Sequence, residues 1–84
     1  MELRKMALAV ASRNDLASFV VALKSDLEAH QDKWENPTLD RFLDAMESWI
    51  ESMDGYYRNR GQEIPQEPTW RTFAEILCAS RIYE

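Results

Sequence analysis

Apolar residues recur along the chain at the spacing of α-helices, and no alternating pattern is long enough to predict a strand. The chain has only two glycines and three prolines, and most of them stand between the apolar segments, where helices are expected to end. The first segment is the shortest, and its residues at i, i+3, i+4 and i+7 are Leu3, Met6, Ala7 and Val10. This pattern predicts a short N-terminal helix with frayed ends.

A second helix is predicted to begin near Arg13 and to end before Trp34. Ser12 precedes it, and Asp15 follows Ser12 by three residues, as in a capping box. In that motif the hydroxyl accepts a hydrogen bond from a free amide of the first turn. The apolar stripe of this helix consists of Leu16, Phe19, Val20, Leu23 and Leu27.

The third predicted helix is the longest and begins at Pro37, with Asn36 as its N-cap, because proline loses no hydrogen bond at the first helical position. It ends near Gly61, which suits a C-terminal cap. Gly55 lies inside this helix and costs about 1 kcal/mol relative to alanine, which predicts a kink or a close packing contact.

A surface loop over residues 62–68 precedes a fourth helix, which Thr69 caps and which continues through Ile82. Its apolar arc is wider than a simple surface helix requires. This helix is therefore expected either to pack between two other helices or to meet another chain.

These elements predict an all-α fold, a compact array of three main helices and a short N-terminal helix. Its 84 residues form a single helical domain, residues 1–84, since a chain of this length supports one core. The residues expected in that core are Leu16, Phe19, Val20, Leu23, Leu27, Leu39, Phe42, Leu43, Met46, Trp49, Ile50, Met53, Trp70, Phe73 and Leu77.

The charge of the chain excludes some classes of partner. Fifteen acidic and ten basic residues give a net charge of -5, which is the wrong sign for holding nucleic-acid phosphates. No apolar run approaches the roughly 18 residues that a membrane span needs. The single cysteine, Cys78, has no partner for an internal disulfide, which fits a reducing compartment and predicts a cytoplasmic protein.

The residue types that catalysis and cofactors require are scarce. The chain has one histidine, His30, and one cysteine, Cys78, which leaves no set of zinc ligands and no pair of nucleophile and base. It also lacks a phosphate-binding glycine loop and a serine elbow. We therefore expect no metal, no cofactor and no enzymatic activity.

Several motifs together resemble a family of small bacterial proteins of unknown function. They are residues 34–39 (WENPTL), residues 53–57 (MDGYY), and residues 68–84, where PTW is followed by FAEIL and RIYE. The likeness extends over most of the chain from Ser12 onwards. It implies a bacterial origin and a compact stand-alone domain, and it implies no chemistry.

A second, weaker likeness is to the immunity proteins of colicin nucleases. Those are acidic four-helix proteins in which an acid shortly before a pair of tyrosines docks on a basic toxin. Here Asp54, Tyr56 and Tyr57 are similarly arranged, although no proline follows the tyrosines and the third helix is long. The likeness is one of physical character, and it implies an inhibitor or immunity-like role.

The third predicted helix carries acids at spacings of four, three, four and three residues, which places them within one narrow stripe. Two interpretations are open: a solvated face whose charges suit the helix dipole, or a docking surface for a basic protein. The stretch from Asp26 to Asp54 has a net charge of -7, so the chain is polarised. The stripe consists of Asp40, Asp44, Glu47, Glu51 and Asp54.

The expected contact patch adds Tyr56 or Tyr57, of which one should reach the surface, and Arg58. The leading hypothesis is a non-enzymatic interaction module that binds a basic protein through this patch. The alternative is a structural protein that dimerises through its C-terminal helix, so the expected state is a monomer or a weak homodimer. A small enzyme or ligand carrier, which would need a deep pocket, is the third hypothesis.

Overall fold

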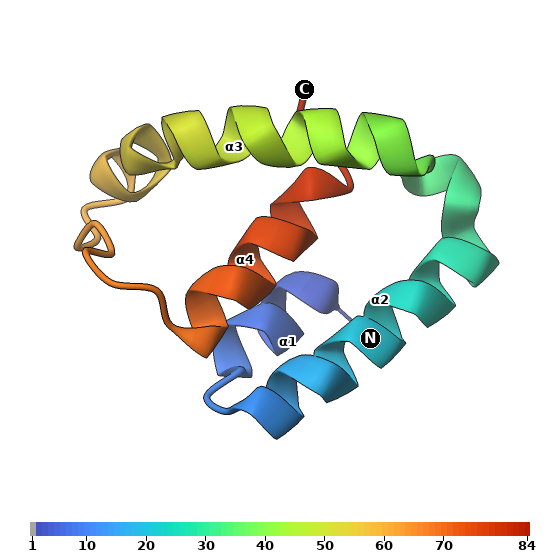
Figure 1. Cartoon of the computed structure of the whole chain (residues 1–84), viewed down its shortest axis with the longest axis horizontal. Coiled ribbons are helices and arrows are strands. Elements are labelled where there is room, and N and C mark those ends of the chain that lie inside the picture. The colour runs from blue at the N-terminus through green and yellow to red at the C-terminus, as the bar shows by residue number, and fades with distance from the viewer. Residues whose placement is uncertain (1) are drawn as a thin grey trace.

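A computed structural model describes residues 2–84 as an all-α fold, which confirms the predicted class. The helices are α1 (Leu3–Ala9), α2 (Arg13–His30), α3 (Leu39–Asn59) and α4 (Trp70–Ser80), and a short 3-10 helix, η1 (Gln31–Lys33), follows α2. In Figure 1, α3 lies along the upper edge of the molecule and α4 extends from it across the middle, with α1 and α2 below.

The ends of the helices follow the predicted capping residues in most places. The Asp15 amide donates to Ser12 Oγ at 3.1 Å, and the Thr72 amide donates to Thr69 Oγ1 at 3.0 Å. Gly61 adopts a positive φ of 68° just after α3, as a C-terminal cap requires. The fourth helix ends at Ser80 and not at Ile82, so it is two residues shorter than predicted.

The start of α3 was predicted wrongly. Thr38 is its N-cap, and Asn36 lies outside the helix. The Asn36 side-chain amide donates to the carbonyls of Ser80 at 3.1 Å and Tyr83 at 2.8 Å, and its backbone amide donates to the Arg81 carbonyl at 3.0 Å. Carbonyls at the end of a helix lack donors within that helix, and here the N–H groups of Asn36 are the donors.

The main core forms between α1, α2 and α4, with the corner residue Trp34. The N-terminal helix is central to it, because Leu3, Ala7 and Val10 are all buried. Their burial opposes the fraying that is expected of so short a helix. The fourth helix contacts α1, α2 and α3, which confirms that it packs between other helices.

Among the helices of residues 2–84, α4 is the one that packs closely against α3. Arg4 of α1 reaches α3 through its hydrogen bond to Tyr56, and α2 does not lie against α3. This arrangement explains why part of the predicted core is wrong: apolar stripes on α2 and α3 that would cover each other remain apart. Phe19, Leu23 and Trp49 are buried as predicted, and six further residues are half-buried. The residues exposed against expectation are Val20, Leu39, Leu43, Ile50, Trp70 and Phe73.

Gly55 lies within an α3 that runs unbroken for 21 residues. A Cβ atom added at Gly55 would meet no atom within 4 Å. The predicted close packing contact at this position is therefore wrong.

Candidate interaction surface

The acidic stripe of α3 is exposed to solvent along its whole length. Helical geometry places its five carboxylates on one face, and Arg58 follows on the same face one turn beyond Asp54. Within residues 2–84, the one ion pair closer than 4.0 Å joins His30 to Asp26. Within the described chain, none of the five carboxylates therefore has a basic side chain within 4.0 Å.

The first carboxylate of the stripe is held at the start of α3. The Thr38 hydroxyl donates a hydrogen bond to Asp40 Oδ1 at 2.7 Å. This bond favours the ionised form and lowers the pKa of Asp40 below its ordinary value. Asp40 therefore stays charged at neutral pH.

Tyr57 does not belong to the exposed patch, which corrects the expected site. Only 4% of its surface is accessible, and its hydroxyl donates to Glu75 Oε2 at 3.1 Å. Burial, together with the nearby Glu75 carboxylate, raises the pKa of Tyr57 well above its ordinary value. Its hydroxyl is therefore an internal tie between α3 and α4.

Tyr56 is half-buried and points to the other side of α3 from the stripe. Its ring packs edge-on against Trp49, with ring centroids 4.9 Å apart, and its hydroxyl accepts a hydrogen bond from Arg4 at 3.0 Å. The structure thus brings the five acids and Arg58 together but separates both tyrosines from them.

A row of apolar side chains lies directly alongside the acidic stripe and was missed as a surface. Leu39 is 73% exposed, Leu43 50% and Ile50 48%. These three positions fall within about 40° of one another around the helix, next to the carboxylates. Their spacing is that of core residues, so no pattern in the sequence distinguished them from the buried face of α3.

Where this apolar row begins, a groove separates α3 from α2. Its volume is about 320 Å³, and Val20, Leu27 and Leu39 are among the residues that line it. The lining also includes Trp34, whose ring stacks on Phe42 at a centroid distance of 6.0 Å. The Trp34 indole is fixed by a 2.8 Å hydrogen bond to Asp26, so the groove is preformed at this end.

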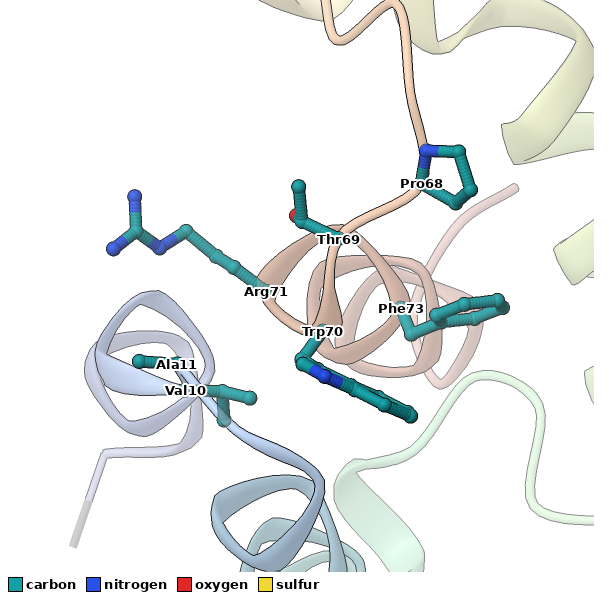
Figure 2. Close-up of a pocket in the computed structure, with 7 residues that line it drawn as sticks. All are labelled: Val10, Ala11, Pro68, Thr69, Trp70, Arg71 and Phe73. Carbon is teal, nitrogen blue, oxygen red and sulfur yellow. The ribbon is translucent and has the colours of Figure 1, made fainter.

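The first turn of α4 presents a further apolar area. Trp70 and Phe73 are 43% and 49% exposed, beside a shallow hollow of about 600 Å³. Figure 2 shows the two rings projecting from one side of the helix while Arg71 points to the other. This is the surface on which the alternative of dimerisation through the C-terminal helix depends.

In the part of the chain that the structure describes, no group of three or more His, Cys, Asp or Glu residues is placed to hold a metal ion. No helix between residues 2 and 84 is long and apolar enough to cross a membrane. Cys78 is buried with a free thiol, as predicted.

Comparison with known proteins agrees with the resemblance seen in the motifs. Residues 12–84 match the sequence model of a family that is described as a family of unknown function. No curated protein and no solved structure matches the chain.

Proposed function

The chain belongs to that family, DUF7660, and we propose that it is a non-enzymatic interaction module that binds a basic amphipathic helix of a partner protein. The observation that carries this proposal is the exposed apolar row of α3 with the unpaired acidic stripe beside it. The apolar row would receive the apolar face of the partner helix. The carboxylates would face its lysine and arginine side chains.

The apolar half of the proposal follows from the cost of leaving such residues in water. Along one line of α3, Leu39, Leu43 and Ile50 are each exposed by about half or more. Contiguous apolar surface of this kind is typical of interaction sites in soluble proteins. A partner helix that lies along α3 would bury the whole row at once, as in helix-in-groove recognition.

The acidic half of the proposal determines the charge of the partner. Like charges at i and i+4 repel by roughly 0.2–0.5 kcal/mol per pair, and in the described chain no basic group closer than 4.0 Å offsets this. A basic partner would relieve the repulsion, and the field of the stripe would steer its approach.

A role as an inhibitor or immunity-like factor is part of this proposal. The chain would inhibit a basic protein if the helix that it binds belongs to the active or binding site of that protein. The cytoplasm is the compartment we propose, since the free thiol of Cys78 fits reducing conditions.

The test uses synthetic helical peptides as probes. A peptide of about 18 residues spans about 27 Å, enough to cover the apolar row. One peptide has leucines on one face and lysines on the other, a second has glutamates in place of the lysines, and a third is a scrambled version of the first. We expect fluorescence anisotropy to detect binding of the first peptide alone, and the binding should weaken as salt concentration rises.

Two triple variants with the same change in net charge distinguish the effect of the acidic stripe from the effect of net charge alone. Reversal of Asp44, Glu47 and Glu51 to lysine should weaken peptide binding by about tenfold or more. Reversal of Glu28, Glu63 and Glu67, which are exposed elsewhere, is the matched control and should have little effect. Equal losses in both variants would show that net charge alone attracts the peptide and would contradict the proposal.

The alternative occupant of the apolar row of α3 is a second copy of the chain. Light scattering across a range of concentrations should find a monomer. A dimer that the Leu43→Ser, Ile50→Ser double variant dissociates would overturn the proposal in favour of self-association.

A further inference from the structure

A second pocket lies on the other side of α3 from the acidic stripe and takes no part in the proposed interaction. Its volume is about 260 Å³, and its walls come from α1, α3, α4 and the segment that follows α4. This volume is slightly below the roughly 300–1,000 Å³ of pockets that hold drug-sized ligands, so it suits a smaller molecule.

Within residues 2–84, two buried N–H groups of the residues that line the pocket have no hydrogen-bond acceptor. They are Nε1 of Trp49, a residue that is only 8% exposed, and Nε of Arg81. A buried donor without a partner costs roughly 1–3 kcal/mol, and in native proteins nearly all such groups are satisfied. An acceptor supplied from outside the chain would satisfy both donors.

The charge of the pocket is opposite to that of the molecule. Arg4, Arg60 and Arg81 line it, and in the described chain none of them has a carboxylate within 4.0 Å. The one carboxylate of the lining, Glu75, accepts the hydrogen bond from Tyr57. The pocket thus carries a net charge of +2 in a chain whose net charge is -5.

The remaining walls are aromatic and firmly placed. The Trp49 ring meets Tyr56 and Tyr83 edge-on, at centroid distances of 4.9 and 5.3 Å. Arg60 lies over the Tyr56 ring at 4.6 Å, and the Tyr83 hydroxyl is hydrogen-bonded to Ser52 at 2.8 Å. Aromatic walls of this kind pack well against a flat ring.

We propose that this pocket binds a small aromatic carboxylate. The planar guanidinium group of Arg81 matches the two oxygens of a carboxylate, and the Trp49 indole N–H is a further donor to the same group. The ring of the ligand packs among Trp49, Tyr56 and Tyr83. This inference is independent of the proposed function, since it uses a different surface of the molecule.

Titration of the isotope-labelled full chain, followed by nuclear magnetic resonance, tests the proposal. Benzoate is the probe, benzamide is its uncharged counterpart, and inorganic phosphate is an anion without a ring. Benzoate should shift the indole signal of Trp49, identified by its absence in Trp49→Phe, more than those of Trp34 and Trp70. Benzamide should bind about tenfold more weakly, because it lacks the charge-assisted hydrogen bonds.

Arginine variants locate the site. Arg81→Gln and Arg60→Gln should each weaken benzoate binding by about tenfold. Arg71→Gln is the matched control, because Arg71 lies on α4 but does not line this pocket. Phosphate that binds as tightly as benzoate, benzamide that binds equally well, or a failure of benzoate to shift the Trp49 signal would each overturn the proposal.

Discussion

At the scale of single residues, a few polar side chains join segments that are far apart in the sequence. Asn36 ties the corner between α2 and α3 to the end of α4 through three hydrogen bonds, and Tyr57 ties α3 to α4 through Glu75. Each of these residues satisfies groups that would otherwise be left without partners away from water. Their substitution should therefore affect stability more than their polar character suggests.

Asn36→Ala should lower the free energy of unfolding by about 1–3 kcal/mol, because the carbonyls of Ser80, at the end of α4, and of Tyr83, beyond it, lose their donor. Urea denaturation followed by circular dichroism measures this loss. Asn14→Ala, at an exposed position of α2, is the control and should change stability by less than about 0.5 kcal/mol. An equal effect of the two substitutions would show that Asn36 does not join the segments.

The raised pKa of Tyr57 predicts a loss of stability in alkali. In the unfolded chain Tyr57 titrates near its ordinary value of 10.0, whereas the folded protein keeps it protonated to higher pH. Its contribution to stability is thus fully present below pH 10 and is lost as the pH rises beyond that value.

Tyr57→Phe cannot ionise, so its free energy of unfolding should fall less steeply above pH 10 than that of the unsubstituted chain. Urea denaturation at several pH values between 8 and 12 gives the two slopes. Parallel slopes would mean that the ionisation of Tyr57 is not linked to unfolding.

At the scale of elements, α1 contributes more than its length suggests. It has only seven residues, too few for a stable helix in isolation. Its packing nevertheless comes from three buried side chains, those of Leu3 and Ala7 within the helix and of Val10 directly after it. Tertiary packing therefore stabilises a helix that local propensity does not.

A chain that begins at Ser12 should lose most of its cooperative thermal transition. Burial of a leucine or valine side chain contributes about 1.5–3 kcal/mol, and a small domain has only about 5–15 kcal/mol in total. Scanning calorimetry of the shortened chain measures the effect. In the full chain, Leu3→Ala should cost about 2–5 kcal/mol, and the half-exposed Leu8→Ala should cost clearly less; similar costs would contradict a central role for α1.

At Gly55, within α3, a substitution is expected to stabilise the protein. Because a Cβ atom at this position meets nothing within 4 Å, Gly55→Ala should raise the free energy of unfolding by about 1 kcal/mol through helix propensity alone. Gly61→Ala should instead destabilise the protein, since Gly61 has a positive φ. Thermal denaturation of the two variants compares them, and a lower melting temperature for Gly55→Ala would show an unseen packing requirement.

At the scale of the whole molecule, the fold is more open than its size requires. The radius of gyration is 12.5 Å, whereas a compact domain of this length has about 11.9 Å. The reason is the placement of α3, which touches α4 but leaves its other apolar side and the facing side of α2 uncovered.

The double variant Leu43→Ser, Ile50→Ser should therefore keep its stability to within about 1–2 kcal/mol, because both side chains already lie half in water. Its binding of a hydrophobic dye should fall. Phe19→Ala, at a fully buried position, is the contrasting control and should cost about 3–5 kcal/mol. Severe destabilisation of the double variant would instead place Leu43 and Ile50 inside the core.

Local patterns in the sequence were sufficient for the helices and most of their ends. The capping residues Ser12 and Thr69 and the terminating Gly61 act within one turn of the chain, so their effect can be predicted without knowing the fold. The alignment of the five acids along one face of α3 was predictable for the same reason, since carboxylates at helical spacing share a face, whereas their exposure was not.

Only the tertiary structure decided which apolar faces meet. Leu3 and Leu39 have the same local character, yet Leu3 is 6% exposed and Leu39 is 73% exposed, because α1 lies against α4 and α3 does not reach α2. The donor role of Asn36, the burial of Tyr57 and the gathering of Arg4, Arg60 and Arg81 likewise depend on residues distant in the chain. Periodicity specifies the side of a helix that is apolar, whereas the packing of helices determines what covers that side.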